Sequence, residues 1–246
     1  MYLTTKGLVL RVTDYNDRDS LLTLLTPEHG KLTVKARGLR RKNSPLVAPC
    51  QLLAYGEFTL FEYRGSYTIN EAASVELFQQ LRRDLTRLSL GTYFAQCAEV
   101  LCQEDLPNPE LLSLVLNCLH VLCKGEREEK VKAVFELRAA CLAGYLPDLG
   151  YCGNCGSEDA DRFDISAGQL LCNRCRSSSV AGIRLPVSSG TLEAMRYITQ
   201  CDAKRLFSFE LGQENLIQLS QVTESYLCTQ LERGFSALDF YKSLLI

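Results

Sequence analysis

Two Cys-x-x-Cys pairs constrain the fold of this chain more than any other feature of its sequence. The first pair is Cys152 and Cys155, and the second, after sixteen intervening residues, is Cys172 and Cys175. This spacing is typical of a tetrahedral metal site in which each pair forms a tight turn and a hairpin joins the turns. We therefore predict one structural Zn²⁺ per chain. Two disulfides or two pairs of free thiols are the alternatives that the spacing leaves open.

A site with four cysteine ligands argues against catalysis. Four thiolates fill the coordination shell of zinc and leave no position for water or a substrate. The sequence shows no phosphate loop, dinucleotide-binding turn, hydrolase elbow or metalloprotease helix. Its only histidines are His29, expected in an exposed turn, and His120, expected in a helical core. We predict no catalytic residues and no enzyme; a redox enzyme that uses the Cys-x-x-Cys pairs is the least favoured class.

The remaining cysteines could suggest a secreted disulfide framework, but the sequence near Met1 argues against secretion. No apolar segment typical of a signal peptide follows Met1, and no apolar run reaches the ~20 residues of a membrane-spanning helix. We therefore expect a cytoplasmic protein whose other thiols are reduced and mostly buried as small hydrophobic groups. These are Cys50, Cys97, Cys102, Cys118, Cys123, Cys141, Cys201 and Cys228.

The first eighty residues have the pattern of short strands. Five segments rich in β-branched and aromatic residues lie close together, and turn residues separate them, which favours a small closed barrel. A long loop with glycine, two prolines and four cations interrupts the series between Arg37 and Pro49. The expected strands are Gly7–Val12, Ser20–Thr26, Lys31–Lys35, Glu57–Tyr63 and Tyr67–Ala72.

The hydrophobic period becomes helical after about Leu77. Asn108 and Pro109 form a plausible helix start, with an N-cap residue followed by a proline at the first helical position. Helical patterns resume after the cysteines, beyond Ser177–Ser179 and Pro186. The expected helices are Leu88–Leu101, Asn108 to about Leu122, Arg127–Gly144, Thr191–Cys201, Gln213–Arg233 and Ala237–Leu245. The segment that carries Cys152, Cys155, Cys172 and Cys175 is therefore predicted to be inserted into a helical domain.

A basic stretch in the barrel region is the best candidate for a binding site. Between His29 and Gly56 there are six Lys or Arg residues and no Asp or Glu, although the whole chain has a net charge of −2. A local cationic surface of this kind suits a nucleic-acid backbone. Strand alternation also places Lys31, Lys35 and, if the strand continues, Arg37 on the same face of the strand. The predicted DNA contacts are Lys31, Lys35, Arg37, Arg40, Arg41 and Lys42.

Two observations leave the function open at this point. A solvated charged loop is the ordinary explanation of a basic run. Residues 81–246 carry 17 Lys or Arg against 21 Asp or Glu, so a helical protein-interaction scaffold without direct DNA binding is the alternative. The aromatic residues Phe58, Phe61, Tyr63 and Tyr67 could stack on bases, but alternation sends at least half of them into the core.

Several motifs together resemble the RecO family of DNA repair and recombination mediators. The resemblance lies in Gly7–Arg11, Asp14-Tyr15, Asp19–Thr26 and Glu28–Lys31, and in the basic run Ala36–Lys42. Gly144–Leu149 leading into Cys152 and Cys155 is similar to that family's entry into its zinc module. The resemblance follows the chain order over nearly its whole length, which makes the combination specific although each motif is weak.

The resemblance implies a multidomain α+β protein. It comprises an OB-type barrel in residues 1–80 that binds DNA, a helical domain in 81–150 and 181–246, and a zinc ribbon inserted at 151–180. It further implies a non-enzymatic role in which the protein binds single- and double-stranded DNA, anneals strands and helps load a recombinase onto coated DNA. The implied partners are the single-stranded-DNA-binding protein and RecR. The mildly acidic net charge suggests modest affinity for DNA alone, or affinity that depends on a partner.

Overall fold

The computed structural model describes residues 1–175 and 182–245, which form two compact units. The first unit contains residues 1–125 and 235–246, and the second contains residues 126–234. The helices of the predicted helical domain are therefore shared between the two units. Whether the four predicted segments fold as separate domains stays a prediction. Its boundary at residues 180 and 181, and the predicted punctuation at Ser177–Ser179, lie outside the described residues.

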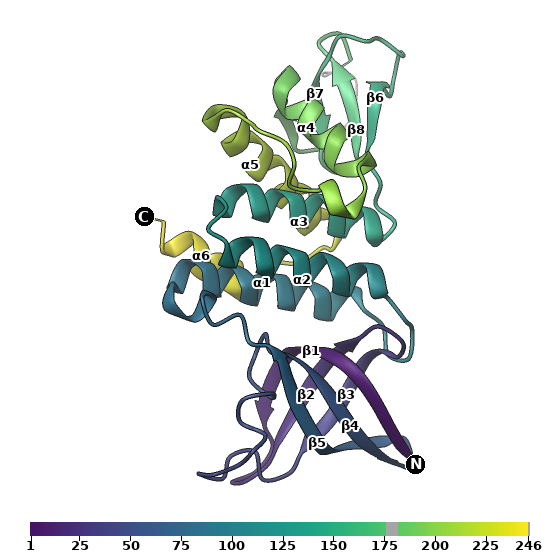
Figure 1. Ribbon diagram of the computed structural model, residues 1–246. Helices are drawn as coiled ribbons and strands as arrows, with labels where there is room; N and C mark the ends of the chain where they lie inside the picture. Colours follow the sequence, from purple (N-terminus) through teal and green to yellow (C-terminus); the bar gives the residue numbers. More distant parts are fainter. Residues whose placement is uncertain (176–181, 246) are drawn as a thin grey trace. The chain divides into compact units, whose positions relative to one another are not determined.

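The first unit begins with a closed five-stranded barrel, which confirms the predicted fold class (Figure 1). Its order is β1-β2-β3-β5-β4, with β4 pairing back to β1 and with the β3–β5 pair parallel. Alternate side chains such as Leu32, Val34 and Phe58 fill the interior, since successive residues of a strand face opposite sides. The strands are β1 Tyr2–Asp14, β2 Ser20–Thr26, β3 Gly30–Ala36, β4 Tyr55–Tyr63 and β5 Ser66–Glu76.

Three helices complete the first unit, and two of them pack against the barrel at β1 and β2. They are α1 Leu85–Leu101, α2 Pro109–Cys123 and α6 Ser236–Ser243, and a short 3-10 turn, η1 Leu81–Arg83, precedes α1. The predicted start of α2 is confirmed, because the Asn108 side chain accepts a hydrogen bond from the Leu111 amide. The expectation of a buried His120 is wrong: His120 lies with Ser113 and Asn117 on an exposed polar stripe of α2.

The long loop between β3 and β4 is anchored rather than flexible. Leu39, Leu46 and Cys50 belong to the barrel's hydrophobic core although they lie outside its strands. The Cys50 amide also bonds to the Leu46 carbonyl at 3.1 Å. Because burying these side chains stabilises one loop path, the cations between them are held at defined places on the surface.

The second unit combines three helices with a four-stranded sheet of order β6-β8-β7-β9. Arg138, which interrupts the apolar pattern of α3, donates hydrogen bonds to the Ile198 and Thr199 carbonyls at the end of α4, which the helix itself cannot satisfy. The elements are α3 Glu128–Leu142, β6 Asp148–Cys152, β7 Ala160–Asp164, β8 Gln169–Cys172, β9 Arg184–Pro186, α4 Ser189–Gln200, the 3-10 turn η2 Ala203–Arg205 and α5 Gln213–Gln230.

The predicted hairpin between the cysteine pairs is formed by β7 and β8. Gly168 has a φ of +63°, and the Asp164 carboxylate accepts hydrogen bonds from the Ser166 and Ala167 amides inside the turn. Phe163 packs edge-on against Tyr226 of α5 with ring centroids 5.3 Å apart. The turn end of the hairpin is therefore fixed to α5 of its own unit.

The helices and the cysteines bear on two further expectations. Within residues 1–175 and 182–245 no helix has both the length and the apolar character needed to cross a membrane. All twelve cysteines are free thiols in the structure. Of the eight cysteines outside the paired motifs, Cys50, Cys97, Cys102 and Cys118 are buried and the other four are half-buried.

Candidate nucleic-acid interface and metal centre

The four predicted metal ligands come together in the second unit. The sulfur atoms of Cys152, Cys155, Cys172 and Cys175 all lie within 4.8 Å of one another. The Cys155 and Cys172 sulfurs are 3.6 Å apart, close to the ~3.8 Å edge of a tetrahedron with Zn–S bonds of ~2.3 Å. The four-cysteine cluster can therefore hold one metal ion, and its donor set fits zinc.

Local backbone geometry prepares the Cys152 thiol to bind a cation. Burial raises the pKa of the Cys152 thiol, but hydrogen bonds from the Cys172, Asn154 and Cys155 amides outweigh this effect and lower the pKa to about 6. The thiolate is the form that binds metal. Gly156 provides the positive φ of +71° that follows the first pair. The chain therefore builds the first turn around an anionic sulfur.

The four-cysteine cluster has few apolar side chains packed against it. Its apolar contacts consist of Cys152, Leu171 and Cys172, with Ala160 and Cys175 partly buried against them. A bound metal would supply most of the folding free energy of a segment this small. The cluster is consequently best explained as a structural support, and it offers no open coordination position.

The six predicted basic residues are not all at one place. Lys31, at the start of β3, donates a hydrogen bond from Nζ to the Glu99 carbonyl of α1 at 3.2 Å. Lys35 is near the opposite end of the strand, and Arg37 follows it on the exposed side. The alternation that places Leu32 and Val34 inside the barrel is as predicted. Lys31 is nevertheless separated from the other five cations by most of the length of β3.

Acidic residues from another loop neutralise two of the cations. Lys35 Nζ lies 3.3 Å from the Asp19 carboxylate and 4.5 Å from the centre of the Tyr15 ring. Arg40 forms an ion pair with Asp14 at 3.2 Å and donates to the Asn16 carbonyl at 2.8 Å. The acid-free stretch in the sequence therefore overstates the positive charge of the surface, because the β1–β2 loop brings carboxylates against it.

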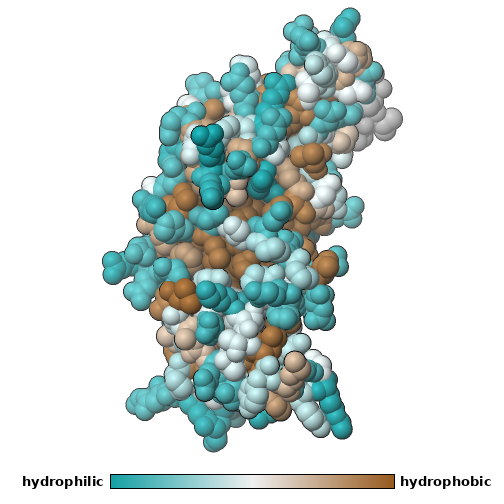
Figure 2. All heavy atoms as spheres, turned by 45° about the vertical axis from the view of Figure 1, so that its right-hand side comes forward, coloured by the Kyte–Doolittle hydropathy of each residue, from teal (hydrophilic) through white to brown (hydrophobic). Residues whose placement is uncertain are grey.

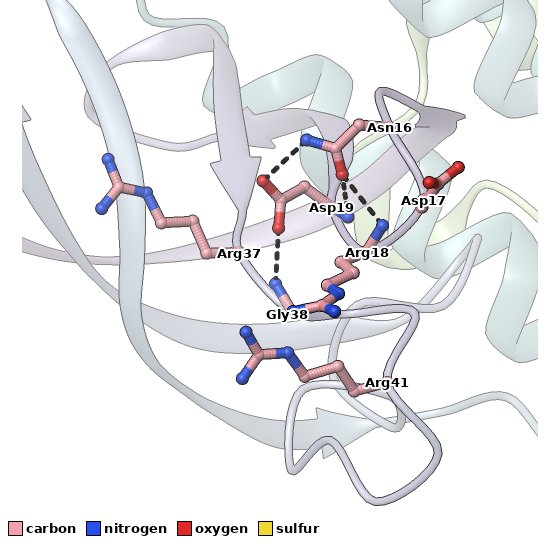
Figure 3. Close-up of a pocket in the computed structure, with 7 residues that line it drawn as sticks. All are labelled: Asn16, Asp17, Arg18, Asp19, Arg37, Gly38 and Arg41. Atoms are coloured by element: carbon pink, nitrogen blue, oxygen red, sulfur yellow. Dashed lines mark hydrogen bonds between the residues drawn. The ribbon is translucent and has the colours of Figure 1, made fainter.

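Arg37 and Arg41 face solvent beside a hollow of about 520 Å³. Figure 3 shows the β1–β2 loop on one side of this hollow and the segment after β3 on the other. Among the described residues we find no ion pair for Arg18, Arg37, Arg41 or Lys42. Figure 2 shows hydrophilic side chains projecting from this end of the barrel, at the bottom of the view. The hollow is lined by Asn16, Asp17, Arg18, Asp19, Arg37, Gly38 and Arg41.

Asp19 connects the two sides of the hollow. Its carboxylate accepts hydrogen bonds from the Gly38 amide at 2.9 Å and from the Asn16 side-chain amide at 3.1 Å (Figure 3). These bonds, the one from Gly38 first, lower the pKa of Asp19 to about 2, so the carboxylate stays charged at neutral pH. Gly38 has a φ of +68°, which favours glycine at this bend. The arrangement fixes Arg37 and Arg41 relative to Arg18.

Arg18 is the cation that sequence reasoning missed. It stands between Asp17 and Asp19, so the local sequence indicates an ordinary solvated turn with balanced charge. In the structure the Arg18 carbonyl accepts a hydrogen bond from the Arg40 amide at 3.1 Å, which places residue 18 beside the basic loop. Only the pairing of β2 with β3, which brings Ser20 opposite Ala36, could have located it.

Comparisons with known proteins match one family over nearly the whole chain. The family model described as recombination protein O N terminal matches residues 1–78, and the one described as recombination protein O C terminal matches residues 82–239. A protein named DNA repair protein RecO from Acetivibrio thermocellus is 34% identical, with 99% of this chain and 97% of the relative covered. The protein of the same name from Bacillus subtilis is 30% identical, with 92% of this chain and 88% of the relative covered.

Proposed function

The chain belongs to the RecO family of DNA repair proteins, and we propose that it is a non-enzymatic mediator that binds DNA through its barrel. In this role it binds single- and double-stranded DNA, anneals complementary strands and helps load a recombinase onto coated single strands. The single-stranded-DNA-binding protein and RecR are its proposed partners in the bacterial cytoplasm. One observation carries the proposal: Arg18, Arg37 and Arg41 line an open hollow at one end of the barrel.

The proposed contact residues differ in how readily each can bind a phosphate. Arg37, Arg41 and Lys42 are exposed and, within the described residues, form no ion pair, so they can neutralise phosphates at little cost. Lys35 and Arg40 first have to exchange a carboxylate partner for a phosphate. Lys31 is the weakest proposed contact, because it lies toward α1. Arg18 is added to the six residues that the sequence suggested.

We propose that zinc occupies the four-cysteine cluster and supports the second unit rather than the DNA contacts. The sulfur geometry and the small apolar cluster around it support this assignment. The two sites then have separate roles, because the basic hollow belongs to the first unit.

Replacing Arg37, Arg41 and Lys42 together with alanine tests the DNA site. Each lost phosphate contact on a single strand reduces the salt slope by about 0.7, so the slope of log K against log salt should become shallower by about 2. Fluorescence anisotropy of a labelled single strand over a salt series measures it. A control triple variant, Lys124, Lys204 and Arg205 to alanine, removes the same charge from exposed positions outside the barrel and should keep the wild-type slope.

Two outcomes would contradict the proposal at different levels. An unchanged slope in the barrel variant, with wild-type binding intact, would reject the residues but not the activity. Wild-type protein without salt-sensitive DNA binding would instead favour the scaffold alternative. The same series repeated with the single-stranded-DNA-binding protein present shows whether affinity depends on that partner.

A second pair of variants asks whether Asp19 organises the hollow. Asp17→Ala and Asp19→Ala each remove one negative charge beside the proposed phosphate site, which by itself favours DNA binding. Asp19→Ala also releases the Gly38 amide and Lys35, so the loop that carries Arg37 and Arg41 loses part of its attachment to the β1–β2 loop. We expect Asp17→Ala to bind DNA at least as tightly as wild type, and Asp19→Ala to bind several-fold more weakly than Asp17→Ala. Equal affinities of the two variants would show that Asp19 has no positioning role.

A further inference from the structure

Three exposed aromatic side chains gather at one edge of the barrel. Tyr2 is 63% exposed, Phe61 is 41% exposed and Tyr63 is 60% exposed. The other exposed large apolar residues in the described barrel strands, Val12 and Val75, lie elsewhere on β1 and β5. Phe58, by contrast, is fully buried in the core. The structure thus separates aromatic residues that the sequence alone could not assign to the inside or the outside.

Tyr2 and Phe61 form a cross-strand pair. They are direct partners in the β1–β4 register, and their ring centroids lie 5.4 Å apart with the planes tilted by 56°. Tyr63 follows two residues later and therefore faces the same side of β4. The Arg64 guanidinium lies 5.2 Å from the Tyr63 ring centre and covers one of its faces. Among these three rings, Tyr2 and Phe61 are therefore the two that contact each other and over which no cation of the described residues lies.

The strand register connects this pair to the basic residues. Phe61 is opposite Thr68 of β5, and Thr68 is opposite Lys35 of β3. The row from Tyr2 to Lys35 crosses three strand intervals, roughly 14 Å at ~4.8 Å each. Lys35 in turn contacts Asp19 on the wall of the hollow. Apolar rings therefore stand at one end of the row and cations at the other.

We propose that Tyr2 and Phe61 form a stacking platform for the bases of single-stranded DNA whose phosphates follow Lys35 toward Arg37 and Arg41. The proposal rests on the DNA-binding function proposed above and adds the part of the ligand that phosphate contacts do not reach. Aromatic rings beside a cationic track are the combination with which proteins hold single strands without reading their sequence. Duplex DNA keeps its bases stacked inside, so the platform favours single strands over duplexes.

The ordinary explanation of such a pair is that it stabilises the pairing of β1 with β4. That role requires contact between the two rings but no ligand. The explanations differ in one measurable respect, because only a stacking platform distinguishes DNA with bases from a sugar-phosphate chain without them.

The test compares an oligothymidylate with an abasic deoxyribose-phosphate oligomer of equal length. For Tyr2→Ala/Phe61→Ala we expect the dissociation constant for oligothymidylate to rise about tenfold or more, because each lost stack weakens binding. Affinity for the abasic oligomer and the salt slope should stay at wild-type values, since no phosphate contact is lost. Phe240→Ala, which removes another exposed ring from α6 of the same unit, is the matched control.

A second variant covers the case in which the double variant unfolds. The chain contains no tryptophan, so Phe61→Trp introduces a single indole at the platform. We expect oligothymidylate to quench its fluorescence with the same midpoint as binding, while the abasic oligomer and the Phe240→Trp control give no quenching. Absence of quenching despite saturating binding would overturn the platform. Wild-type protein that binds neither oligomer in a salt-sensitive way would overturn the proposed DNA binding itself.

Discussion

The Cys175→Ser variant is expected to lose its zinc and the local structure around the cluster. Serine keeps the size of the side chain but replaces the thiolate with a weak, protonated ligand. Changes outside the ligand shell already cost about 10- to 100-fold in metal affinity, so the loss of a direct ligand should exceed 100-fold. Metal analysis should therefore fall from one zinc per chain to well below one after dialysis.

The structural consequence should be confined to the part of the second unit that the metal supports. Cys152, Leu171 and Cys172 form only a small apolar cluster, and structural zinc supplies most of the folding free energy of such a segment. The turn end of the hairpin has independent support, because Gln230 donates a hydrogen bond to the Ile165 carbonyl at 3.0 Å and Phe163 packs on Tyr226. Hydrogen exchange should accelerate at Gly153 and Gly156 and change little at Ile165.

Cys201→Ser is the matched control for this experiment. Cys201 is a half-buried thiol of the same unit but lies outside the cluster, so its variant should retain one zinc and wild-type exchange. A metal-free wild-type preparation with slow exchange at Gly153, and with four freely reactive cluster thiols, would contradict the zinc assignment. That result would return the second alternative left open by the sequence, two pairs of free thiols.

Local signals in the sequence predicted the parts of this protein that depend on neighbouring residues. Strand alternation placed Leu32 and Val34 inside the barrel, the Asn-Pro step located the start of α2, and the cysteine spacing identified the metal cluster. Each of these features is governed by residues a few positions apart, or by a ligand chemistry with few alternatives.

Features that depend on tertiary pairing could not be predicted in this way. Asp14 and Asp19 reduce the charge of the basic stretch only because the β1–β2 loop folds against it. The same loop places Arg18 beside the basic residues. The distribution of the helices between two units depends on packing that no helical period specifies. The acid-free run indicated where the cations are in the chain, but not which of them face solvent without a partner.

The buried charges of α3 are the clearest case of this kind. Lys132 and Glu136 are four residues apart, which in a sequence is typical of an exposed helical ion pair. In the structure they are 2% and 0% exposed, and their charged groups lie 3.0 Å apart. Lys132 also contacts Glu224 of α5 at 2.8 Å and donates to the Ser220 carbonyl, and Thr223 donates to Glu136 at 2.8 Å. This network connects α3 to α5 through fully satisfied polar groups.

Lys132→Met should therefore destabilise the second unit strongly. Removing the cation leaves the buried Glu136 carboxylate without its charge partner, which typically costs about 3–5 kcal/mol of unfolding free energy. Because the chain forms two compact units, a single global unfolding free energy is not well defined, and native-state hydrogen exchange of α3 amides is the appropriate measurement. Arg11→Met removes an ion pair with Glu99 whose arginine is 59% exposed, and this control should cost less than about 1 kcal/mol.

The pH dependence of stability and a double variant identify the cause of the destabilisation in Lys132→Met. Burial raises the pKa of Glu136, an effect that Lys132 opposes in the wild type, so removal of Lys132 raises the folded-state pKa further above its unfolded value. The protonated carboxyl is then the favoured buried form, so the deficit of Lys132→Met should be smallest below the unfolded pKa and grow as pH rises through the folded one. Lys132→Met/Glu136→Leu removes the two most buried charges and leaves Glu224, whose side chain is 22% exposed, so it should recover most of the lost stability. A deficit that is independent of pH and unrelieved in the double variant would mean that lost packing of the lysine stem, rather than an uncompensated charge, destabilises α3 and α5.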